Sequence, residues 1–205
     1  TSRTRLMVAA CVAAGLVSLW LRAGLPLIAI GGSSLDDSLF LAQARSLLER
    51  RWLGDFDHRT LAKGMFYPLF IGLSFASTLP LKVAEQLVYL GVCGALAFIL
   101  ARRTARPGLA AALFVALAFN PIMWIPFMAR VVREGLYISL SLLAVALMAG
   151  SLWSLLQGES ARRRVLWSAA SGLALGCFWL TREEGPWLLP SLAILVLGTA
   201  ASCWD

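Results

Sequence analysis

The feature that most constrains this chain is a series of long apolar runs. A transmembrane helix needs about 20 consecutive, mostly apolar residues, and runs of about that length recur along the sequence. They cover residues 6–30, 84–101, 108–127, 135–156, 165–181 and 186–204. Only 14% of the residues are charged, against about 25% in soluble domains. The sequence therefore predicts an all-α fold, a polytopic helical bundle of about six spans that forms a single transmembrane domain over residues 1–205.

The long segment between the first two runs, residues 32–82, is charged but has its own pattern. Apolar residues recur there at helical spacing, at Leu39/Phe40, Ala44, Leu47/Leu48 and Trp52. This spacing predicts an amphipathic helix on the membrane surface, which ends where "LGDF" breaks the pattern. The apolar stretch from Tyr67 to Leu79 is too short to span and is closed by Pro80, so an interfacial or re-entrant helix is expected.

The positive charge of the chain, +7 in total, collects at the ends of the apolar runs. That placement is typical of topology signals and lipid-headgroup contacts rather than of nucleic-acid binding, so membrane lipids are expected partners and nucleic acid is not. With six spans, three basic clusters fall on one side of the membrane: Arg3/Arg5, Arg102/Arg103/Arg106 and Arg162/Arg163/Arg164. The positive-inside rule makes this side, and the N-terminus, cytoplasmic. The expected location is a bacterial inner (plasma) membrane. Arg22, inside the first run, could snorkel towards an interface.

Four charged clusters fall on the opposite side, which would be periplasmic or extracellular. They are "SLDDSLF" with Asp36 and Asp37, "HRTLAKGMFYP" with Lys63 and Tyr67, "MARVVREGLY" with Arg130, Arg133, Glu134 and Tyr137, and "TREEGPW" with Arg182, Glu183 and Glu184. The members of the third cluster are spaced to share one helical face. Ionisable groups this close to the hydrocarbon are costly, which makes them candidates for function.

Each cluster also has a structural interpretation. Ser34 followed by Asp37 fits a helix N-terminus, where short polar and acidic side chains are favoured, and this leaves Asp36 as the sharper chemical candidate. Lys63 could simply snorkel, and Arg130 and Glu134 could form an i,i+4 ion pair. The tyrosines near the span ends suit interface anchors.

Acids flanked by arginines and a lysine beside lipid suit group transfer from a lipid phosphate. A carboxylate can remove the proton of an acceptor hydroxyl or amine, while Arg and Lys stabilise a phosphate leaving group. The sequence contains no P-loop, G-x-G-x-x-G or G-x-S-x-G motif, which gives no support to a nucleotide-fuelled reaction.

At these residues the sequence resembles the GT-C superfamily of membrane glycosyltransferases. Its members include protein O-mannosyltransferases, oligosaccharyltransferases and the lipid A aminoarabinose transferase. The matching stretches are "LDDSLFLAQARSLLERRWLG", "KGMFYPLFIGLSF", "REGLYISLSLL" and "LTREEGPWLLPSLAIL". The likeness rests on their order and covers roughly residues 32–197.

The resemblance implies an inverting transfer of a sugar from a polyprenyl-phosphate donor to an acceptor at the outer membrane face. By this likeness Asp36 would be the general base, with Asp37 in the supporting catalytic position, and Lys63 would meet the donor phosphate. Further phosphate-binding candidates are Arg130, Arg133 and Arg182, and supporting candidates are Glu134, Glu183 and Tyr67.

Some GT-C enzymes use a divalent cation, so Mg²⁺ or Mn²⁺ is left open as a cofactor. Asp36, Asp37 and Glu134 offer the oxygen ligands that these ions accept. Members of the superfamily usually have more spans, and further transmembrane segments or a subunit are expected to complete the fold.

Two other functions stay open. One is a non-catalytic or truncated membrane subunit that binds lipid or a partner protein. The other is a transporter or flippase, which is disfavoured because the two halves of the chain show no convincing pair of matching, Gly/Pro-broken spans.

Overall fold

The computed structural model describes residues 2–29, 36–54, 63–182 and 189–202. Within these ranges the regular structure is helical and contains no β-strand, apart from one isolated backbone bridge between Ile28 and Arg130. The predicted all-α fold class is confirmed. Sequence predictions on Ser34, Glu183 and Glu184 lie outside the described residues.

Among the described residues, four helices have the length and composition to cross a membrane. They are α1 (Ser2–Ala23), α4 (Leu81–Thr104), α5 (Pro107–Ala118) together with the 3-10 turn η2 (Pro121–Trp124), and α6 (Glu134–Leu156). Two further helices, α7 (Ala161–Trp179) and α8 (Leu189–Ser202), follow. α7 has three arginines in its first turn and α8 has 14 residues. Neither helix combines the length and the apolar composition of the other four. The expectation of six spans therefore stays a prediction.

Proline sets several helix ends that the apolar runs alone do not reveal. The first run was expected to span 6–30, but α1 ends at Ala23, because Pro26 disfavours helical geometry at the residue before it. The run over 108–127 is not one helix either. α5 ends at Ala118, and Pro121 and Pro126 open the short 3-10 turns η2 and η3 (Pro126–Ala129), as expected for a residue that cannot continue an α-helix.

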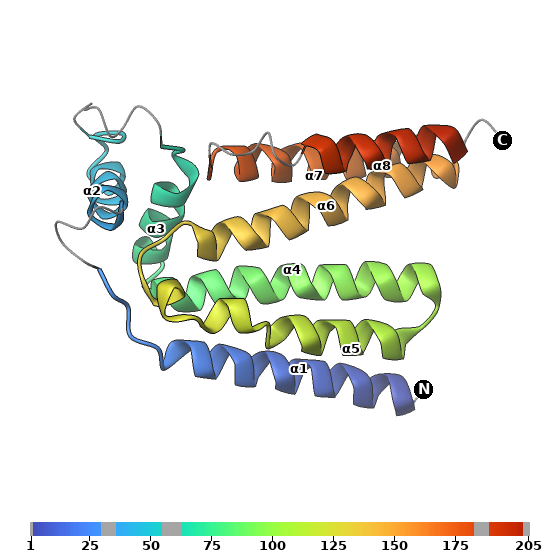
Figure 1. The fold of residues 1–205 in the computed structure, drawn as a ribbon, viewed down its shortest axis with the longest axis horizontal. Coiled ribbons are helices and arrows are strands. Elements are labelled where there is room, and N and C mark those ends of the chain that lie inside the picture. Colours follow the sequence, from blue (N-terminus) through green and yellow to red (C-terminus); the bar gives the residue numbers. More distant parts are fainter. Residues whose placement is uncertain (1, 30–35, 55–62, 183–188, 203–205) are drawn as a thin grey trace.

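The long helices lie side by side and define a bundle with two different ends (Figure 1). At one end lie the N-terminus, the α4–α5 turn and the start of α7, which carry Arg5, Arg102/Arg103/Arg106 and Arg162/Arg163/Arg164; we call it the arginine end. At the opposite end α2 (Asp37–Leu48) and α3 (Phe66–Ala76) run across the bundle direction; we call it the α2–α3 end. The segments expected on one side of the membrane thus gather at one end of the bundle.

α2 and α3 lie where the sequence predicts two short helices, and they pack against each other. α2 buries Phe40 and Ala44, four residues apart on one face. The chain leaves α2 through left-handed backbone at Arg50, Trp52 and Gly54. The placement of both helices on a membrane surface stays a prediction.

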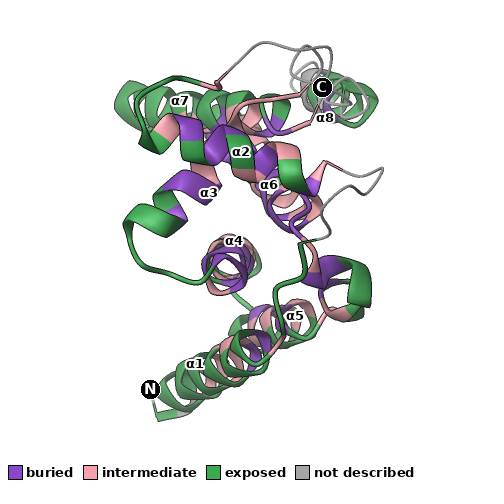
Figure 2. Cartoon of the chain, turned by 90° about the vertical axis from the view of Figure 1, so that its left-hand side faces the viewer, coloured by how far each residue is buried: buried purple, intermediate pink, exposed green. Residues whose placement is uncertain are grey.

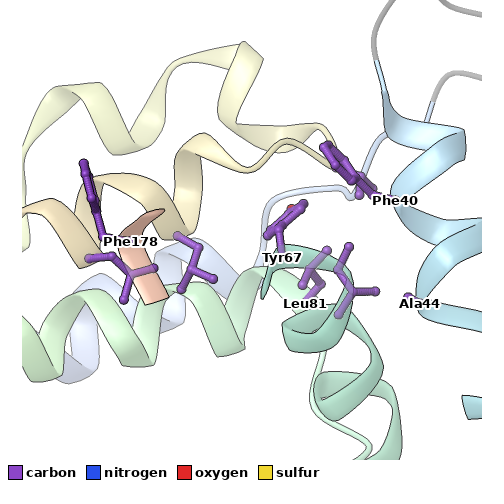
Figure 3. Close-up of a cluster of buried hydrophobic side chains, with 9 residues drawn as sticks. Phe40, Ala44, Tyr67, Leu81 and Phe178 are labelled. Carbon is purple, nitrogen blue, oxygen red and sulfur yellow. The ribbon is translucent and has the colours of Figure 1, made fainter. Parts of the chain in front are cut away.

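The larger hydrophobic cluster joins α2 and α3 to the bundle. It contains Phe40, Tyr67, Leu81 and Phe178 (Figure 3), from four different helices. The rings of Phe40 and Tyr67 meet edge to face with centroids 5.2 Å apart, a favourable arrangement for aromatic pairs. α1, by contrast, is largely exposed along its length (Figure 2), which suits a helix whose outer face meets lipid.

Arg22 lies in the interior, so the expectation that it snorkels is wrong. Its side chain is completely buried and its guanidinium donates hydrogen bonds to the backbone oxygens of Met123 at 2.6 Å and Met128 at 2.9 Å. The 3-10 turns explain this, because they leave carbonyl groups without a helical partner. Arg22 therefore ties the end of α1 to the α5–α6 connection.

Candidate functional site

The first pair of predicted site residues meets at the α2–α3 end. Lys63 Nζ lies 2.7 Å from Asp36 Oδ2, and the two side chains are 22% and 31% exposed. Asp36 is the N-cap residue of α2, yet its side chain makes no capping hydrogen bond within the described residues. Asp36 therefore faces a cation while staying accessible to a ligand.

The second pair is buried. Asp37, the first residue of α2, is 1% exposed, and Arg130 grips its carboxylate with two nitrogens: Nε donates to Oδ2 at 3.1 Å and Nη2 to Oδ1 at 3.0 Å. This forked geometry is the strong form of an arginine–carboxylate pair. Asp37 thus lies in the first turn of α2, where the sequence predicts an acid, and its buried ion pair also fixes α2 to the α5–α6 connection.

The position of Arg130 corrects the prediction of a single charged helical face. α6 begins only at Glu134, and Arg130 has an extended backbone ahead of it, after η3. Its neighbours bond to the extended segment after α1: Ile28 N–H donates to the Ala129 oxygen at 2.9 Å, and Val131 N–H donates to the Ile28 oxygen at 3.2 Å. Because the backbone is extended there, Arg130 turns towards α2 rather than along α6.

The third pair joins α6 to the segment after α7. Arg182 Nη1 donates to Glu134 Oε1 at 3.3 Å. Its guanidinium lies 5.1 Å from the centre of the Tyr137 ring, a cation–π contact, and Tyr137 stacks on Phe178 at 4.8 Å. The aromatic pair thus supports Arg182 from beneath.

The lysine-bearing segment packs against the segment that carries Arg182. Phe66 N–H donates to the Leu180 oxygen at 3.1 Å, and a Cβ on Gly64 would overlap that same carbonyl group. Only glycine permits this close approach. Gly64 therefore sets Lys63 close to the chain that leads into Arg182, and four segments distant in sequence converge at one end of the bundle.

Two other predicted site residues are placed differently. Tyr67 points inward rather than into the site, is completely buried, and its hydroxyl donates to Glu85 Oε1 at 3.0 Å. Burial, followed by the negative charge of Glu85, raises the pKa of Tyr67 well above its usual range. Tyr67 and Tyr89 are both core residues, so the anchor interpretation is wrong for them. Arg133 is half-buried at the N-cap of α6, and Glu183 lies outside the described residues.

Beneath the site lies a buried charge network that the sequence did not single out. Glu85 Oε2 accepts a hydrogen bond from Lys82 Nζ at 2.8 Å and lies 3.7 Å from an Arg22 nitrogen, while Oε1 accepts from Tyr67. The side chains of Lys82 and Glu85 are 4% and 0% exposed. A Cβ on Gly135 would lie 2.5 Å from Glu85 Oε2, so this glycine makes room for the carboxylate. The i,i+3 spacing of Lys82 and Glu85 at the start of an apolar helix was the available signal.

A small recess of about 180 Å³ opens beside this network. Its lining is mainly apolar and includes Leu27, Leu41, Phe75 and Leu79, with Arg22 and Lys82 contributing the cationic part. Leu27, Phe75 and Leu79 are exposed to the surroundings. The recess therefore combines an accessible apolar rim with buried positive charge.

The predicted metal ligands are dispersed into separate ion pairs. Asp36, Asp37 and Glu134 face Lys63, Arg130 and Arg182 respectively. Among the described residues no three His, Cys, Asp or Glu side chains are grouped as metal ligands would be. The use of Mg²⁺ or Mn²⁺ stays a prediction.

Comparison with known proteins adds no family: no family model, curated protein or solved structure matches the chain.

Proposed function

We propose that the chain is a membrane glycosyltransferase that moves a sugar from a polyprenyl-phosphate donor to an acceptor, with inversion, at the α2–α3 end. The observation that carries the proposal is the Lys63–Asp36 pair, a base and a cation 2.7 Å apart and both partly exposed. The Arg130–Asp37 and Arg182–Glu134 pairs lie at the same end. Such a concentration of ionised groups at the end of apolar helices is typical of a functional site.

The proposed chemistry is a single displacement. Asp36 accepts the proton of the acceptor hydroxyl or amine as that group attacks the anomeric carbon. The bond between this carbon and the phosphate oxygen breaks, and the phosphate leaves with the bonding electrons on the opposite face of the sugar. The Lys63 ammonium leaves its ion pair with Asp36 and pairs with the donor phosphate instead. This change of partner neutralises the leaving group and frees the Asp36 carboxylate to act as the base. Arg182 is a further candidate for the phosphate, because the segment that leads into it packs against the segment that carries Lys63, while Arg130 holds Asp37 and α2 in place.

The recess beside the buried network supports a lipid-linked donor. Its exposed apolar rim, formed by Leu27, Phe75 and Leu79, suits the first isoprenoid units of a polyprenyl chain. An isoprenoid phosphate would then enter sideways from the bilayer.

The proposed topology has six spans, with α7 and α8 added to the four apolar helices. The arginine clusters at the arginine end support a cytoplasmic position for that end and for the N-terminus. The α2–α3 end then faces the periplasm of a bacterial inner membrane or the exterior. Further transmembrane segments or a subunit would complete the acceptor side.

A second candidate is a non-catalytic membrane subunit that binds the same lipid. It is favoured by the charge neutralisation of four carboxylates, each of which pairs with a cationic side chain: Asp36, Asp37, Glu85 and Glu134. Such pairing also suits a site that holds an anionic lipid without reaction.

The test is a transfer and binding assay on the full chain in liposomes, with a panel of polyprenyl-phosphate sugars. The proposal predicts donor binding and release of polyprenyl phosphate by the wild type. Asp36→Asn should lose transfer and retain donor binding, whereas Glu49→Gln, an acid-to-amide change at the far end of α2, should retain both. Donor binding without transfer, insensitive to Asp36→Asn, would support the second candidate. A chain that binds no such donor fits neither.

A further inference from the structure

A second cavity lies away from the proposed active site, at the arginine end. It is an open groove of about 620 Å³ between α4, α6 and α7. Phe98, Ile99, Arg102 and Arg103 of α4 form one wall, and Arg163, Leu166 and Trp167 of α7 form the other. The groove therefore lies at the opposite end of the bundle from Asp36 and Lys63 (Figure 1).

Positive charge dominates the polar part of this groove. Three arginines line it, Arg102, Arg103 and Arg163, against one acid, Glu159, which leaves a net charge of +2 on the lining. The Glu159 carboxylate accepts a hydrogen bond from Ser154 Oγ at 2.8 Å, so part of its hydrogen-bonding capacity is used within the protein. The groove thus attracts an anion.

Aromatic rings hold two of the arginines in position. The Arg102 guanidinium lies 5.3 Å from the centre of the Phe98 ring, and that of Arg103 lies 5.1 Å from the centre of the Trp153 ring. Such cation–π contacts restrict where a long side chain can point. Because these guanidinium groups are already oriented, binding an anion carries a smaller entropy cost for immobilising the two side chains.

The rest of the groove is apolar and opens outward. Phe98 is 61% exposed, and Leu166 is also exposed. Trp167 packs closely on α6, since a Cβ on Gly150 would lie 2.5 Å from its ring. The groove therefore has a cationic part and an adjoining exposed apolar wall, and it lies where α4 and α6, two membrane-capable helices, come to an end.

We propose that this groove binds an anionic phospholipid, with its phosphate against Arg102, Arg103 and Arg163 and an acyl chain along Phe98 and Leu166. Arginine matches the geometry of a phosphate group, and basic grooves between membrane helices at their cytoplasmic ends recognise anionic headgroups. A zwitterionic lipid carries its own cation and would lose the charge attraction. This site is separate from the proposed donor site and does not depend on the glycosyltransferase proposal.

The test uses the full chain purified in detergent, with lipid binding measured by native mass spectrometry. The probes are dioctanoyl phosphatidylglycerol, dioctanoyl phosphatidylcholine and glycerol phosphate, which has the anionic head without the chains. The variant Arg102→Gln/Arg163→Gln removes two lining charges. Its matched control, Arg106→Gln/Arg164→Gln, removes two charges from the same end, at arginines that are not among the described residues lining the groove. A third variant changes Ala170 of α7, which also lines the groove; Ala170→Trp fills the groove and keeps every charge.

We expect phosphatidylglycerol to bind the wild type about tenfold or more tightly than phosphatidylcholine. The Arg102/Arg163 variant should weaken phosphatidylglycerol binding by about thirtyfold, since each basic residue near an anionic lipid contributes roughly a factor of five, while the control variant should keep wild-type affinity. Ala170→Trp should also lose the lipid. The ratio of the two lipid affinities within each variant guards against a general loss of folding.

Three results would overturn the proposal. Equal loss in the two double variants would mean diffuse attraction to a basic surface. Equal affinity for the two lipids would remove the role of charge. Glycerol phosphate binding as tightly as phosphatidylglycerol would identify a site for a free phosphate compound rather than for a lipid.

Discussion

Replacing Glu85 with Gln isolates the charge of the buried network from its hydrogen bonds. The amide oxygen of Gln can take the place of Oε2 and accept from Lys82, while its NH₂ group faces the Tyr67 hydroxyl, which can accept as well as donate. Shape and hydrogen bonding are thus nearly kept. The negative charge that stands between Lys82 Nζ at 2.8 Å and Arg22 at 3.7 Å is lost.

The expected destabilisation follows from these distances and from burial. Two unit charges about 4 Å apart interact by about 4 kcal/mol at an effective dielectric constant of 20. Glu85 and Arg22 are completely buried and Lys82 is nearly so, so water does little to replace the lost partner. Removing one partner of a buried ion pair costs about 3–5 kcal/mol, and we expect Glu85→Gln to lower the free energy of unfolding by that amount.

The assay is unfolding of the purified chain in mixed micelles with increasing denaturing detergent, followed by loss of helical circular dichroism. Glu49→Gln is the control, because Glu49 forms exposed ion pairs with Arg45 and Arg51 and exposed pairs contribute little. A Glu85→Gln protein as stable as the Glu49→Gln protein would refute the view that Glu85 holds two buried cations.

Three further predictions follow from the site. Arg130→Lys keeps the charge but loses the fork on Asp37, and the same unfolding assay should show a loss of about 2 kcal/mol, the contribution of one hydrogen bond to a charged group; unchanged stability would argue against a two-pronged contact. Gly64→Ala should destabilise by about 1–3 kcal/mol, because its Cβ overlaps the Leu180 carbonyl. The control Gly91→Ala should be neutral or stabilising, because among the described residues its added Cβ would meet no atom within 4 Å apart from its chain neighbours and the backbone of its own helix. The raised pKa of Tyr67 means that its phenol stays protonated in the folded chain above about pH 10, where an unperturbed tyrosine ionises. The contribution of this raised pKa to stability is complete below that pH and is lost as pH rises towards the folded-state pKa. A tyrosinate absorbance difference at 295 nm between wild type and Tyr67→Phe near pH 10.5 would contradict the burial of Tyr67.

The sequence predicts the long helices well because a run of about 20 apolar residues has few alternatives in a membrane. α6, expected over 135–156, begins at Glu134 and ends at Leu156. Helix ends were predicted less well where proline acts within an apolar run, as after Ala23 and Ala118. Hydropathy alone treats such proline residues as part of the run.

The candidate site was predictable as a list of segments but not as a set of pairs. Charged residues beside apolar runs identified Asp36, Lys63 and Arg182 by their cost near hydrocarbon. Asp37, however, pairs with Arg130, which lies 93 residues further along the chain. From local spacing alone, Arg130 was expected to pair with Glu134. The choice depends on the extended backbone at Arg130, which pairs with Ile28.

Arg22 also makes contacts with a distant segment that sequence spacing does not reveal. Within an apolar run, an arginine near a helix end is usually read as a snorkelling residue. Its burial depends on the carbonyl groups that η2 and η3 leave free at the same depth. A pattern along one helix does not reveal acceptors that a distant segment supplies.

The most direct test of the proposed function is the kinetic effect of Asp36→Asn on sugar transfer from a polyprenyl-phosphate donor, with kcat and KM measured separately. A general base acts only in the reaction step, so we predict a fall in kcat of about 10²–10⁴ with little change in the donor KM. Lys63→Gln should in addition raise the donor KM, because it removes the cation that we propose meets the donor phosphate. Transfer by Asp36→Asn at the wild-type rate would contradict the assignment of Asp36 as the base.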